Sequence, residues 1–367
     1  MKKKPTVAIV YGGKSAEYEV SLQTAFSVIN AIDKEKYNVL PVHITNNGEW
    51  LEGSTVTGKL TDVKQLMLED GKEKGEKISA GGWLTPAVAA EENENDKPDI
   101  VFPLLHGPNG EDGTVQGLLE ILGIAYVGSG VAGSAAGMDK IMMKDIFKAH
   151  GLPQADYMRI DRHEWERDRS GYIRSAAETI GFPCFVKPAN NGSSIGINKS
   201  HDENEFVGHV ETAFQYDQKV IVEAAIVGRE VEIGVIGNED LEFSVPGEIK
   251  PNKEFYDYEA KYKDGDTTLI IPADITDEQL KTIRSIAGTA FKILNLSGLA
   301  RVDFFIREAD GQVLINEVNT MPGFTPFSMF PLLWKHTGLE YPDLIDRLIQ
   351  LGIERRQARE SIRYRLE

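Results

Sequence analysis

The sequence predicts an α/β protein that begins with a mostly parallel sheet. Over roughly the first hundred residues, apolar runs typical of strands alternate with helix-like segments, which is the pattern of a parallel α/β domain. Further along, residues 301–319 contain two half-buried strands joined by a turn, which predicts a hairpin. The chain has 367 residues, 41% of them hydrophobic, so it can build two or three domains with apolar cores.

In the first region the strands and helices follow one another closely. The predicted strands are residues 7–11, 37–44, 99–105 and 124–127, and the predicted helices are residues 20–32 and 113–122. Residues 53–97 are rich in Gly, Glu, Lys and Asp, and we interpret them as a surface excursion without chemistry. This region is predicted to be one domain, residues 1–134.

Two further regions complete the predicted organisation, residues 135–226 and residues 227–367. The first opens at Ala135 with a helix that runs to Ala149 and stops before Gly151 and Pro153. It continues with a helix at 174–180, a strand at 185–187, a helix at 203–214 and a strand at 220–223. The last region contains a strand at 230–236, a helix at 277–294, the hairpin, and a charged helical segment at 339–367 that we expect to cover the domain.

Composition excludes several kinds of partner. The net charge of −17 repels nucleic acid and anionic lipid, so a phosphate-bearing ligand must be small and held by a few focused cations. No apolar run reaches the length of a membrane span, and the N-terminus shows no signal-peptide pattern. We therefore expect a cytoplasmic protein. The single cysteine, Cys184, lies in an apolar stretch and is expected to be a buried small residue.

The hairpin carries the most informative residues, Arg301 and Asp303 on one strand and Glu317 and Asn319 on the other. If the connecting loop has an odd number of residues, with Gly311 in the left-handed conformation, Asp303 faces Glu317 and Arg301 faces Asn319. Two carboxylates and an amide oxygen then converge, which favours a hard divalent cation such as Mg²⁺ carrying the phosphates of a nucleotide. The alternative is a solvated hairpin face with an incidental Arg–Asp pair.

A loop at residues 187–196, KPANNGSSIG, is the best candidate for binding phosphate. Glycines let backbone N–H groups approach phosphate oxygens, Lys187 supplies a charge, and Ser193 and Ser194 supply hydroxyl donors. The loop could close over ATP as a lid. The alternative is a flexible hairpin loop without a ligand.

Two other nucleotide motifs match only in part. Residues 8–15 resemble a Walker phosphate loop, but Ala8 stands where the first glycine belongs. Residues 128–133, GSGVAG, fit the dinucleotide fingerprint, but they come late in their domain and precede no clear βαβ unit. We interpret this second motif as an interdomain turn, and a nicotinamide dehydrogenase is the alternative that it leaves open.

The chain resembles the ATP-grasp superfamily and, within it, the D-alanine:D-alanine ligase family over essentially its full length. The resemblance implies a parallel N-terminal α/β domain followed by a two-part ATP-grasp fold of α+β type. Five motifs in the family's order carry it: GGKSAEYEVSL at 12–22, LHGPNGEDGT at 105–114, MDK at 138–140, FYDYEAKY at 255–262 and NEVNTMPGFT at 316–325.

The resemblance assigns a nucleotide site and a metal site. It makes Asp303, Glu317 and Asn319 the ligands of two Mg²⁺ or Mn²⁺ ions. ATP would be held by Lys140 and Lys187 at its phosphates, by Ser194 and Asn316 beside them, and by Glu223, Ala224, Ile226 and Glu230 around the adenine and ribose. Ala224 departs from the family, because many relatives have a lysine there, so adenine binding at this position rests on the backbone.

The amino-acid site can be argued from the residues as well. Glu17 follows the first strand, where parallel α/β sheets bind ligands, and its carboxylate suits the ammonium of the first D-alanine. In the family this glutamate is linked through positions that match Ser193 and Tyr262, and His106 lies near the same substrate. Taken one at a time, Glu17, His106 and Tyr262 also have ordinary structural interpretations, as a helix N-terminal acid, a turn histidine and a packed loop tyrosine.

The implied reaction joins two D-alanine molecules for peptidoglycan precursor synthesis, by way of an acyl phosphate. Arg301 and the backbone N–H of Gly323 would stabilise the tetrahedral intermediate, and Lys261 and Ser328 would bind the carboxylate of the second substrate. Three alternatives remain: a D-alanine:D-lactate ligase or another ATP-grasp carboxylate–amine ligase, the dehydrogenase, and a noncatalytic amino-acid sensor. We expect small-molecule substrates, no nucleic-acid or membrane partner, and a homodimer.

Overall fold

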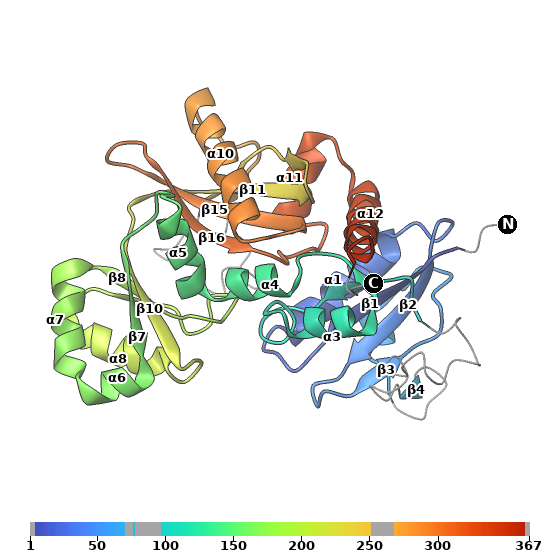
Figure 1. The fold of residues 1–367 in the computed structure, drawn as a ribbon, viewed down its shortest axis with the longest axis horizontal. Coiled ribbons are helices and arrows are strands. Elements are labelled where there is room, and N and C mark those ends of the chain that lie inside the picture. Colours follow the sequence, from blue (N-terminus) through green and yellow to red (C-terminus); the bar gives the residue numbers. More distant parts are fainter. Residues whose placement is uncertain (1–3, 70–75, 78–96, 251–267, 364–367) are drawn as a thin grey trace.

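The computed structural model describes residues 4–69, 76–77, 97–250 and 268–363, which fold into three sheets (Figure 1). The first sheet has the order β4-β3-β2-β1-β5-β6, and its four strands from β2 to β6 are parallel, as predicted. The parallel strands are β1 (Thr6–Gly12), β2 (Asn38–Ile44), β5 (Ile100–Leu104) and β6 (Ala125–Tyr126), and the antiparallel edge is β3 (Trp50–Glu52) and β4 (Glu76–Lys77).

Strand β1 is apolar throughout because both of its faces are covered. Ile9 points into one cluster together with Leu22 of α1 (Tyr18–Ala31), and Ala8 points into another together with Leu119 of α3 (Thr114–Leu122). A strand buried on both faces needs a continuous apolar run rather than an alternating one. A short 3₁₀ helix, η1 (Val63–Leu66), adds Leu66 to the first of these clusters.

The turn after β1 determines where the loop at residues 13–17 lies. Gly12 has a φ of +90°, and a Cβ on it would lie 2.2 Å from the backbone oxygen of Ile44. Only glycine fits this position. The chain can therefore turn sharply and present Glu17 at the start of α1, beside the carboxyl end of the sheet.

The second sheet is antiparallel, with the order β7-β10-β8-β9. Its strands are β7 (Tyr157–Asp161), β8 (Cys184–Pro188), β9 (Asn198–Ser200) and β10 (Lys219–Ala224), with helices α6 (Arg162–Arg167), α7 (Arg169–Thr179) and α8 (Glu203–Ala213). The sheet and helices enclose a separate apolar core that includes Trp165, Val186 and Phe206. Cys184 is buried in that core, as expected.

The third sheet has the order β14-β13-β11-β15-β16, with β12 paired to β11. Its strands are β11 (Gly228–Gly237), β12 (Leu241–Phe243), β13 (Gly247–Lys250), β14 (Thr268–Ile270), β15 (Gly298–Arg307) and β16 (Val313–Asn319), and its helices are α10 (Asp277–Ile293), α11 (Met329–Thr337) and α12 (Tyr341–Glu360). The long β15 lies between β11 and β16, so its polar residues are held by neighbours on both sides.

The predicted single helix from Ala135 to Ala149 is wrong. The chain forms two helices, α4 (Val131–Met138) and α5 (Lys140–Ala149), separated by Asp139 in an extended conformation. The Asp139 carboxylate accepts hydrogen bonds from the backbone N–H groups of Ile141 and Met142, so it caps α5 and stops α4. Met143 and Phe147 of α5 pack in the core of the third sheet. The domain limits at 134/135 and 226/227 stay predictions.

Helix α12 joins the first and third sheets into one body. Leu344 and Leu348 lie in the same apolar cluster as Ile9 and Phe102 of the first sheet. The guanidinium of Arg355 stacks 3.9 Å from the ring centroid of Tyr126, at the end of that sheet. The predicted covering helix therefore packs against the N-terminal region as well as the C-terminal one (Figure 1).

Candidate functional site

The hairpin formed by β15 and β16 pairs its polar residues as predicted. Arg301 lies opposite Asn319, and Asp303 lies opposite Glu317. The positions that alternate with them, Val302 and Val318, lie in the apolar core of the third sheet. One face of the hairpin therefore carries the polar groups while the other is buried.

The predicted reason for this pairing is wrong. The turn is closed by a hydrogen bond from the Arg307 N–H to the Gln312 oxygen, so the loop is residues 308–311 and its length is even. Gly311 does adopt the left-handed conformation, with a φ of +71°. The register shifts instead at a bulge beside Asp303, where Asn316 is the extra residue between Ile315 and Glu317. The bulge exchanges the two faces of β16, so that Ile315 and Val318 both reach the core.

Arg301 is held by one acid on its own strand and by another on the neighbouring strand β11. Its Nε and Nη2 atoms donate to the two oxygens of Asp303 at 2.8 and 2.7 Å, and its Nε lies 3.0 Å from Glu232 Oε2 on β11. Burial alone would lower the pKa of Arg301, but Asp303 and Glu232 raise it well above its usual value. The guanidinium is therefore a permanent cation with a fixed plane.

The predicted metal ligands have a donor set that suits a hard cation. Asp303, Glu317 and Asn319 offer carboxylate and amide oxygens, the donors that Mg²⁺ and Mn²⁺ prefer. Both oxygens of Asp303 are engaged by Arg301, and Asn319 Nδ2 donates to one of them at 2.9 Å. Among the described residues, no cluster of three or more His, Cys, Asp or Glu side chains could hold a metal, and this set has only two carboxylates. The residues fit a metal chemically.

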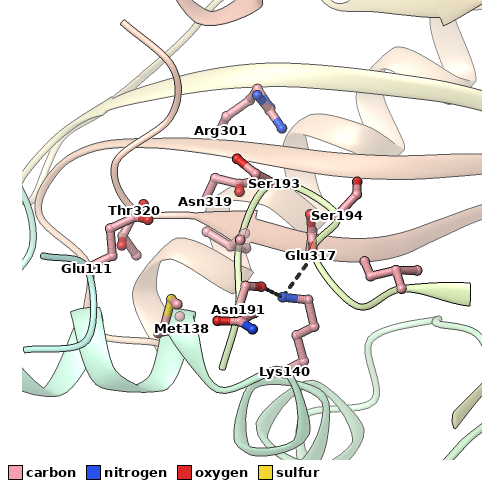
Figure 2. Close-up of a pocket in the computed structure, with 14 residues that line it drawn as sticks. Glu111, Met138, Lys140, Asn191, Ser193, Ser194, Arg301, Glu317, Asn319 and Thr320 are labelled. Carbon is pink, nitrogen blue, oxygen red and sulfur yellow. Dashed lines mark hydrogen bonds and ion pairs between the residues drawn. The ribbon is translucent and has the colours of Figure 1, made fainter. Parts of the chain in front are cut away.

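Two predicted phosphate-binding lysines point toward this hairpin. Lys140 Nζ donates to the backbone oxygen of Asn191 at 2.7 Å and lies 3.8 Å from Glu317 Oε2 (Figure 2). Lys187, on β8, donates to Glu223 Oε2 at 2.6 Å. Burial lowers the pKa of Lys187, but Glu223 and Glu317 outweigh burial and raise it. Both lysines therefore have protein oxygens as their present partners.

The Gly/Ser loop reaches the N-terminal region. Ser193 Oγ donates a hydrogen bond to Glu17 Oε1, which confirms that these two predicted site residues meet. A Cβ on Gly192 would lie 3.0 Å from the same carboxylate, and one on Gly107 would lie 2.8 Å from it. Ser193 has a φ of +50°, an uncommon conformation for a residue with a side chain. Glycines thus let the loop close onto Glu17.

His106 and Glu111 flank Glu17 on the N-terminal side. His106 is buried, and burial lowers its pKa although Glu17 opposes this. Glu111 Oε2 accepts the N–H of Gly107 at 2.6 Å, and burial together with the charge of Glu17 raises its pKa to about 8. The protonated form of Glu111 is therefore favoured near neutral pH.

The turn after β16 holds the remaining predicted catalytic groups. A Cβ on Gly323 would lie 3.2 Å from Ser328 Oγ, so the two residues are in contact. The Ser328 hydroxyl accepts the N–H of Thr325 at 3.1 Å and lies 2.8 Å from the Thr325 hydroxyl. Thr325, which the sequence analysis left without a role, therefore orients Ser328.

Some of the other predicted site residues are placed by the structure, and others lie outside the described residues. Ala224 ends β10, Glu230 lies on β11, and the structure places Ile226 between these strands. Lys261 and Tyr262 lie outside the described residues, as do residues 70–75 and 78–96 of the predicted surface excursion. Ser194 has a φ of +59° and lies in the Gly/Ser loop next to Ser193.

Residues from all three regions line a cavity of about 90 Å³ (Figure 2). Its lining consists of Glu111, Gly137, Met138, Lys140, Asn191, Gly192, Ser193, Ser194, Ile197, Arg301, Glu317, Val318, Asn319 and Thr320. Pockets for drug-sized ligands usually hold roughly 300–1,000 Å³. The walls must therefore part before a nucleotide can enter.

The dinucleotide-like glycines have a packing role. A Cβ on Gly133 would lie 2.6 Å from the backbone oxygen of Asn295, and one on Gly128 would lie 3.4 Å from the Met321 side chain. Both positions are places where the first region meets the third. The structure thus agrees with an interdomain turn and provides no βαβ unit at this motif.

The sequence analysis missed three charged residues of the site, Glu111, Lys144 and Glu232. Glu111 lies within LHGPNGEDGT at 105–114, one of the motifs that carry the resemblance, so the sequence could have pointed to it. Lys144 occurs between Ile141 and Phe147 at helical spacing, which signals a lysine on the apolar face of α5. Glu232 gave no local signal, because its role depends on β11 pairing with β15.

The fold and the site together define an ATP-grasp enzyme, since helix α5 presents Lys140 and the third sheet presents an acidic hairpin to one cavity behind a parallel N-terminal domain. Models of the D-ala D-ala ligase N-terminus and C-terminus match residues 6–129 and 146–350. The chain belongs to the D-alanine–D-alanine ligase family.

Individual relatives agree with this assignment. A D-alanine–D-alanine ligase from Geobacillus kaustophilus (strain HTA426) is 56% identical over 98% of this chain and 98% of its own length. The structure of the D-alanine-D-alanine ligase from Coxiella burnetii has a TM-score of 0.80 and 33% identity, covering 97% of this chain and 96% of that one. The VanG D-Ala:D-Ser ligase from Enterococcus faecalis has a TM-score of 0.81 and 33% identity, covering 95% and 100%.

Proposed function

We infer that this protein joins two D-alanine molecules to D-alanyl-D-alanine at the expense of ATP, by way of an acyl phosphate. Full-length membership of the ligase family carries this conclusion. The product serves peptidoglycan precursor synthesis. A D-alanine:D-lactate ligase is not favoured, because the relatives of about half identity over the full chain are D-alanine–D-alanine ligases.

We propose that the nucleotide lies between the second and third sheets. Lys140 and Lys187 support this, because both ammonium groups pair with protein oxygens that phosphate oxygens could replace. Ser194 and Asn316 would lie beside the phosphates. The backbone of Ala224 and Ile226 would read the adenine, Glu223 would accept from its amino group, and Glu230 would bind the ribose.

We propose that the first D-alanine binds between the N-terminal region and the Gly/Ser loop. Glu17 is the anion for its ammonium, and Glu111 does not compete because its raised pKa keeps it neutral. His106 lies beside Glu17, and Ser193 ties the loop to it. With Tyr262 completing the link, the loop would exclude water from the acyl phosphate.

The chemical step depends on the hairpin and the turn that follows it. The D-alanine carboxylate attacks the γ-phosphorus of ATP and displaces ADP. The amine of the second D-alanine, having lost a proton, then attacks the carbonyl of the acyl phosphate, and phosphate leaves. Arg301 and the N–H of Gly323 would stabilise the tetrahedral oxyanion, because Arg301 is a fixed cation at the cavity wall. Lys261 and Ser328 would hold the carboxylate of the second substrate.

An assay with several acceptors tests the activity directly. ADP and dipeptide release would be measured with ATP and D-alanine, and then with L-alanine, D-serine or D-lactate as the second substrate. We expect D-alanine to be used best and L-alanine to be inactive. Efficient ester formation with D-lactate, or no ADP release with D-alanine, would contradict the proposed function.

We propose that Asp303, Glu317 and Asn319 hold two Mg²⁺ or Mn²⁺ ions, which would offset charge on the transferring phosphoryl group. The substitution Glu317→Gln removes one carboxylate at nearly constant volume. We expect turnover to be abolished while the fold persists, with a weakened dependence on Mg²⁺. Glu308→Gln, on the exposed turn of the same hairpin, is the control. Near-normal turnover of Glu317→Gln at low Mg²⁺ would exclude this residue as a ligand.

We also propose that the protein works as a cytoplasmic homodimer without nucleic-acid or membrane partners. The net charge of −17 supports the absence of polyanionic partners. No helix within the described ranges is both long and apolar enough to cross a membrane. Light scattering after size exclusion tests the dimer, and a monomeric mass near 40.7 kDa would contradict it.

A further inference from the structure

A buried lysine outside the predicted site points at the proposed adenine pocket. Lys144 lies on α5, one turn after Lys140, and its side chain is 1% exposed. Its Nζ lies 3.4 Å from Glu223 Oε1, and among the described residues it makes no hydrogen bond of ordinary geometry. Burying an ammonium group is strongly unfavourable unless the group is well paired. A loosely paired, buried lysine therefore needs a functional explanation.

Glu223 is held between two lysines on different elements. Lys187 on β8 donates to Oε2 at 2.6 Å, and Lys144 on α5 faces Oε1. The Glu223 side chain is 5% exposed. Burial raises its pKa, but the two ammonium groups outweigh burial and bring the pKa to about 2. The carboxylate is thus ionised and can only accept hydrogen bonds.

The two lysines differ in what they can do when nucleotide binds. Lys187 is the proposed phosphate ligand. When phosphate binds, its ammonium must either contact both Glu223 and a phosphate oxygen or leave Glu223 for the phosphate. Lys144 is enclosed between α5 and β10, with its Nζ 6.0 Å from the ring centroid of Tyr157, and it does not line the cavity. Lys144 is therefore placed to remain beside Glu223 as its counter-ion if Lys187 turns toward a phosphate.

We propose that Lys144 is a positioning residue that holds Glu223 as an oriented carboxylate and thereby makes the site select 6-aminopurine nucleotides over 6-oxopurine ones. An amino group at C6 donates to the carboxylate, whereas an oxygen at C6 is a second acceptor and is repelled. This inference rests on the proposed function, in which Glu223 meets the adenine amino group.

Lys144→Met removes the charge at similar length, and Lys148→Met is the matched control. Lys148 lies on the same helix, is exposed, and has its Nζ 5.9 Å from the same Tyr157 ring. Turnover with ATP and with ITP would be measured at saturating D-alanine, and binding of ADP and IDP by calorimetry. For Lys144→Met we expect the KM for ATP to rise about tenfold, kcat to stay within about twofold, and the preference for ATP over ITP to fall about tenfold.

A second pair of variants separates this role from a general loss of packing. Glu223→Gln can donate as well as accept, so its ATP preference should fall by itself. The double variant Lys144→Met/Glu223→Gln buries no unpaired charge at these two positions and should show the same preference as Glu223→Gln. If Lys144→Met fails to fold, the comparison of the double variant with Glu223→Gln tests the inference in its place.

Any of the following results would overturn the inference: an unchanged ATP preference in Lys144→Met, an unchanged preference in Glu223→Gln, or a further fall in the double variant. The same fall in Lys148→Met would also count against it, because the effect would then not need a buried ion pair. If the wild-type enzyme releases no ADP with D-alanine, the proposed function itself fails, and the ADP and IDP affinities still test the role of Lys144.

Discussion

The first and third sheets share one apolar core, whereas the second sheet has a core of its own. Leu344 and Leu348 of α12 pack with Ile9 and Phe102, so the N-terminal and C-terminal regions are joined by buried hydrophobic surface. The second sheet encloses a separate cluster around Phe206. The molecule therefore consists of a two-sheet platform and a separately packed central unit (Figure 1).

The two parts meet mainly through polar groups at the cavity. Ser193 reaches Glu17, the Asn191 oxygen accepts from Lys140, and Glu223 faces Lys144. One small apolar cluster, Ile141, Ala189 and Ile221, adds to them. Polar contacts exchange readily for water or ligand, whereas a shared apolar core does not. The platform therefore carries the groups proposed to act in the reaction, and the central unit would supply closure.

The largest expected effect comes from the platform hairpin. Arg301→Lys keeps the charge but loses the planar fork that holds Asp303 in two hydrogen bonds. We expect kcat to fall by roughly two to three orders of magnitude, as for loss of an oxyanion donor, with little change in ATP affinity. Steady-state kinetics check this, with Arg307→Lys at the exposed end of the same strand as the control. A raised KM for ATP at intact kcat would make Arg301 a ground-state nucleotide contact instead.

Two core substitutions test whether the parts unfold separately. Leu348→Ala in the shared core should destabilise the platform by about 2–5 kcal/mol, and Phe206→Ala should destabilise the central unit by about 3–5 kcal/mol. Hydrogen exchange followed by peptide should then show loosening of β1 and β15 together in the first variant, and of β8 and β10 alone in the second.

Ile121→Ala, at a side chain that is 83% exposed, is the control for both substitutions and should change neither exchange pattern. If Leu348→Ala loosens only the third sheet and leaves β1 protected, the two outer regions do not share a cooperative core. That result would remove the distinction between platform and central unit.

The polar closure contacts should matter more for binding than for stability. Ser193→Ala removes the hydroxyl that donates to Glu17. We expect the free energy of unfolding to change by no more than about 1 kcal/mol, because one exchangeable hydrogen bond is lost. The KM for D-alanine should rise, since the loop no longer closes onto its site. Ser361→Ala, an exposed hydroxyl after α12, is the control, and an unchanged KM in Ser193→Ala would argue against closure through this contact.

A pH dependence is expected at the boundary between the parts. The pKa of Glu111 is raised to about 8, so the folded protein favours its protonated form. Protonated Glu111 contributes its full stabilisation at pH values below the pKa of this side chain in the unfolded protein. The stabilisation decreases as the pH rises toward 8. Glu111→Gln is neutral at every pH and should lack that decrease.

Urea unfolding at pH 5, 7 and 9 measures the difference in the free energy of unfolding between Glu111→Gln and the wild-type protein. We expect the variant to gain relative stability as the pH rises. Glu166→Gln, on the exposed surface of α6, is the control. If the free energies of unfolding of variant and wild type differ by the same amount at pH 5 and pH 9, the pKa of Glu111 is not raised.

Much of the fold followed from local patterns. The alternation of strands and helices predicted the parallel N-terminal sheet, and the period of two along β15 predicted that Arg301 and Asp303 share a face. The break at Asp139 was missed although Asp is a good helix cap, because apolar spacing continues on both sides of it. The elements α6 and α11 were missed as well.

By itself, the sequence determined the kinds of elements, the polar face of the hairpin and the family, because these depend on residues close together in the chain or on long motifs. Only the tertiary structure decided the bulge at Asn316, since the core must take up both Ile315 and Val318. It also decided that α12 packs on the first sheet and that Lys144 meets Glu223. Such contacts join distant residues, and they depend on how faces pack rather than on any local periodicity.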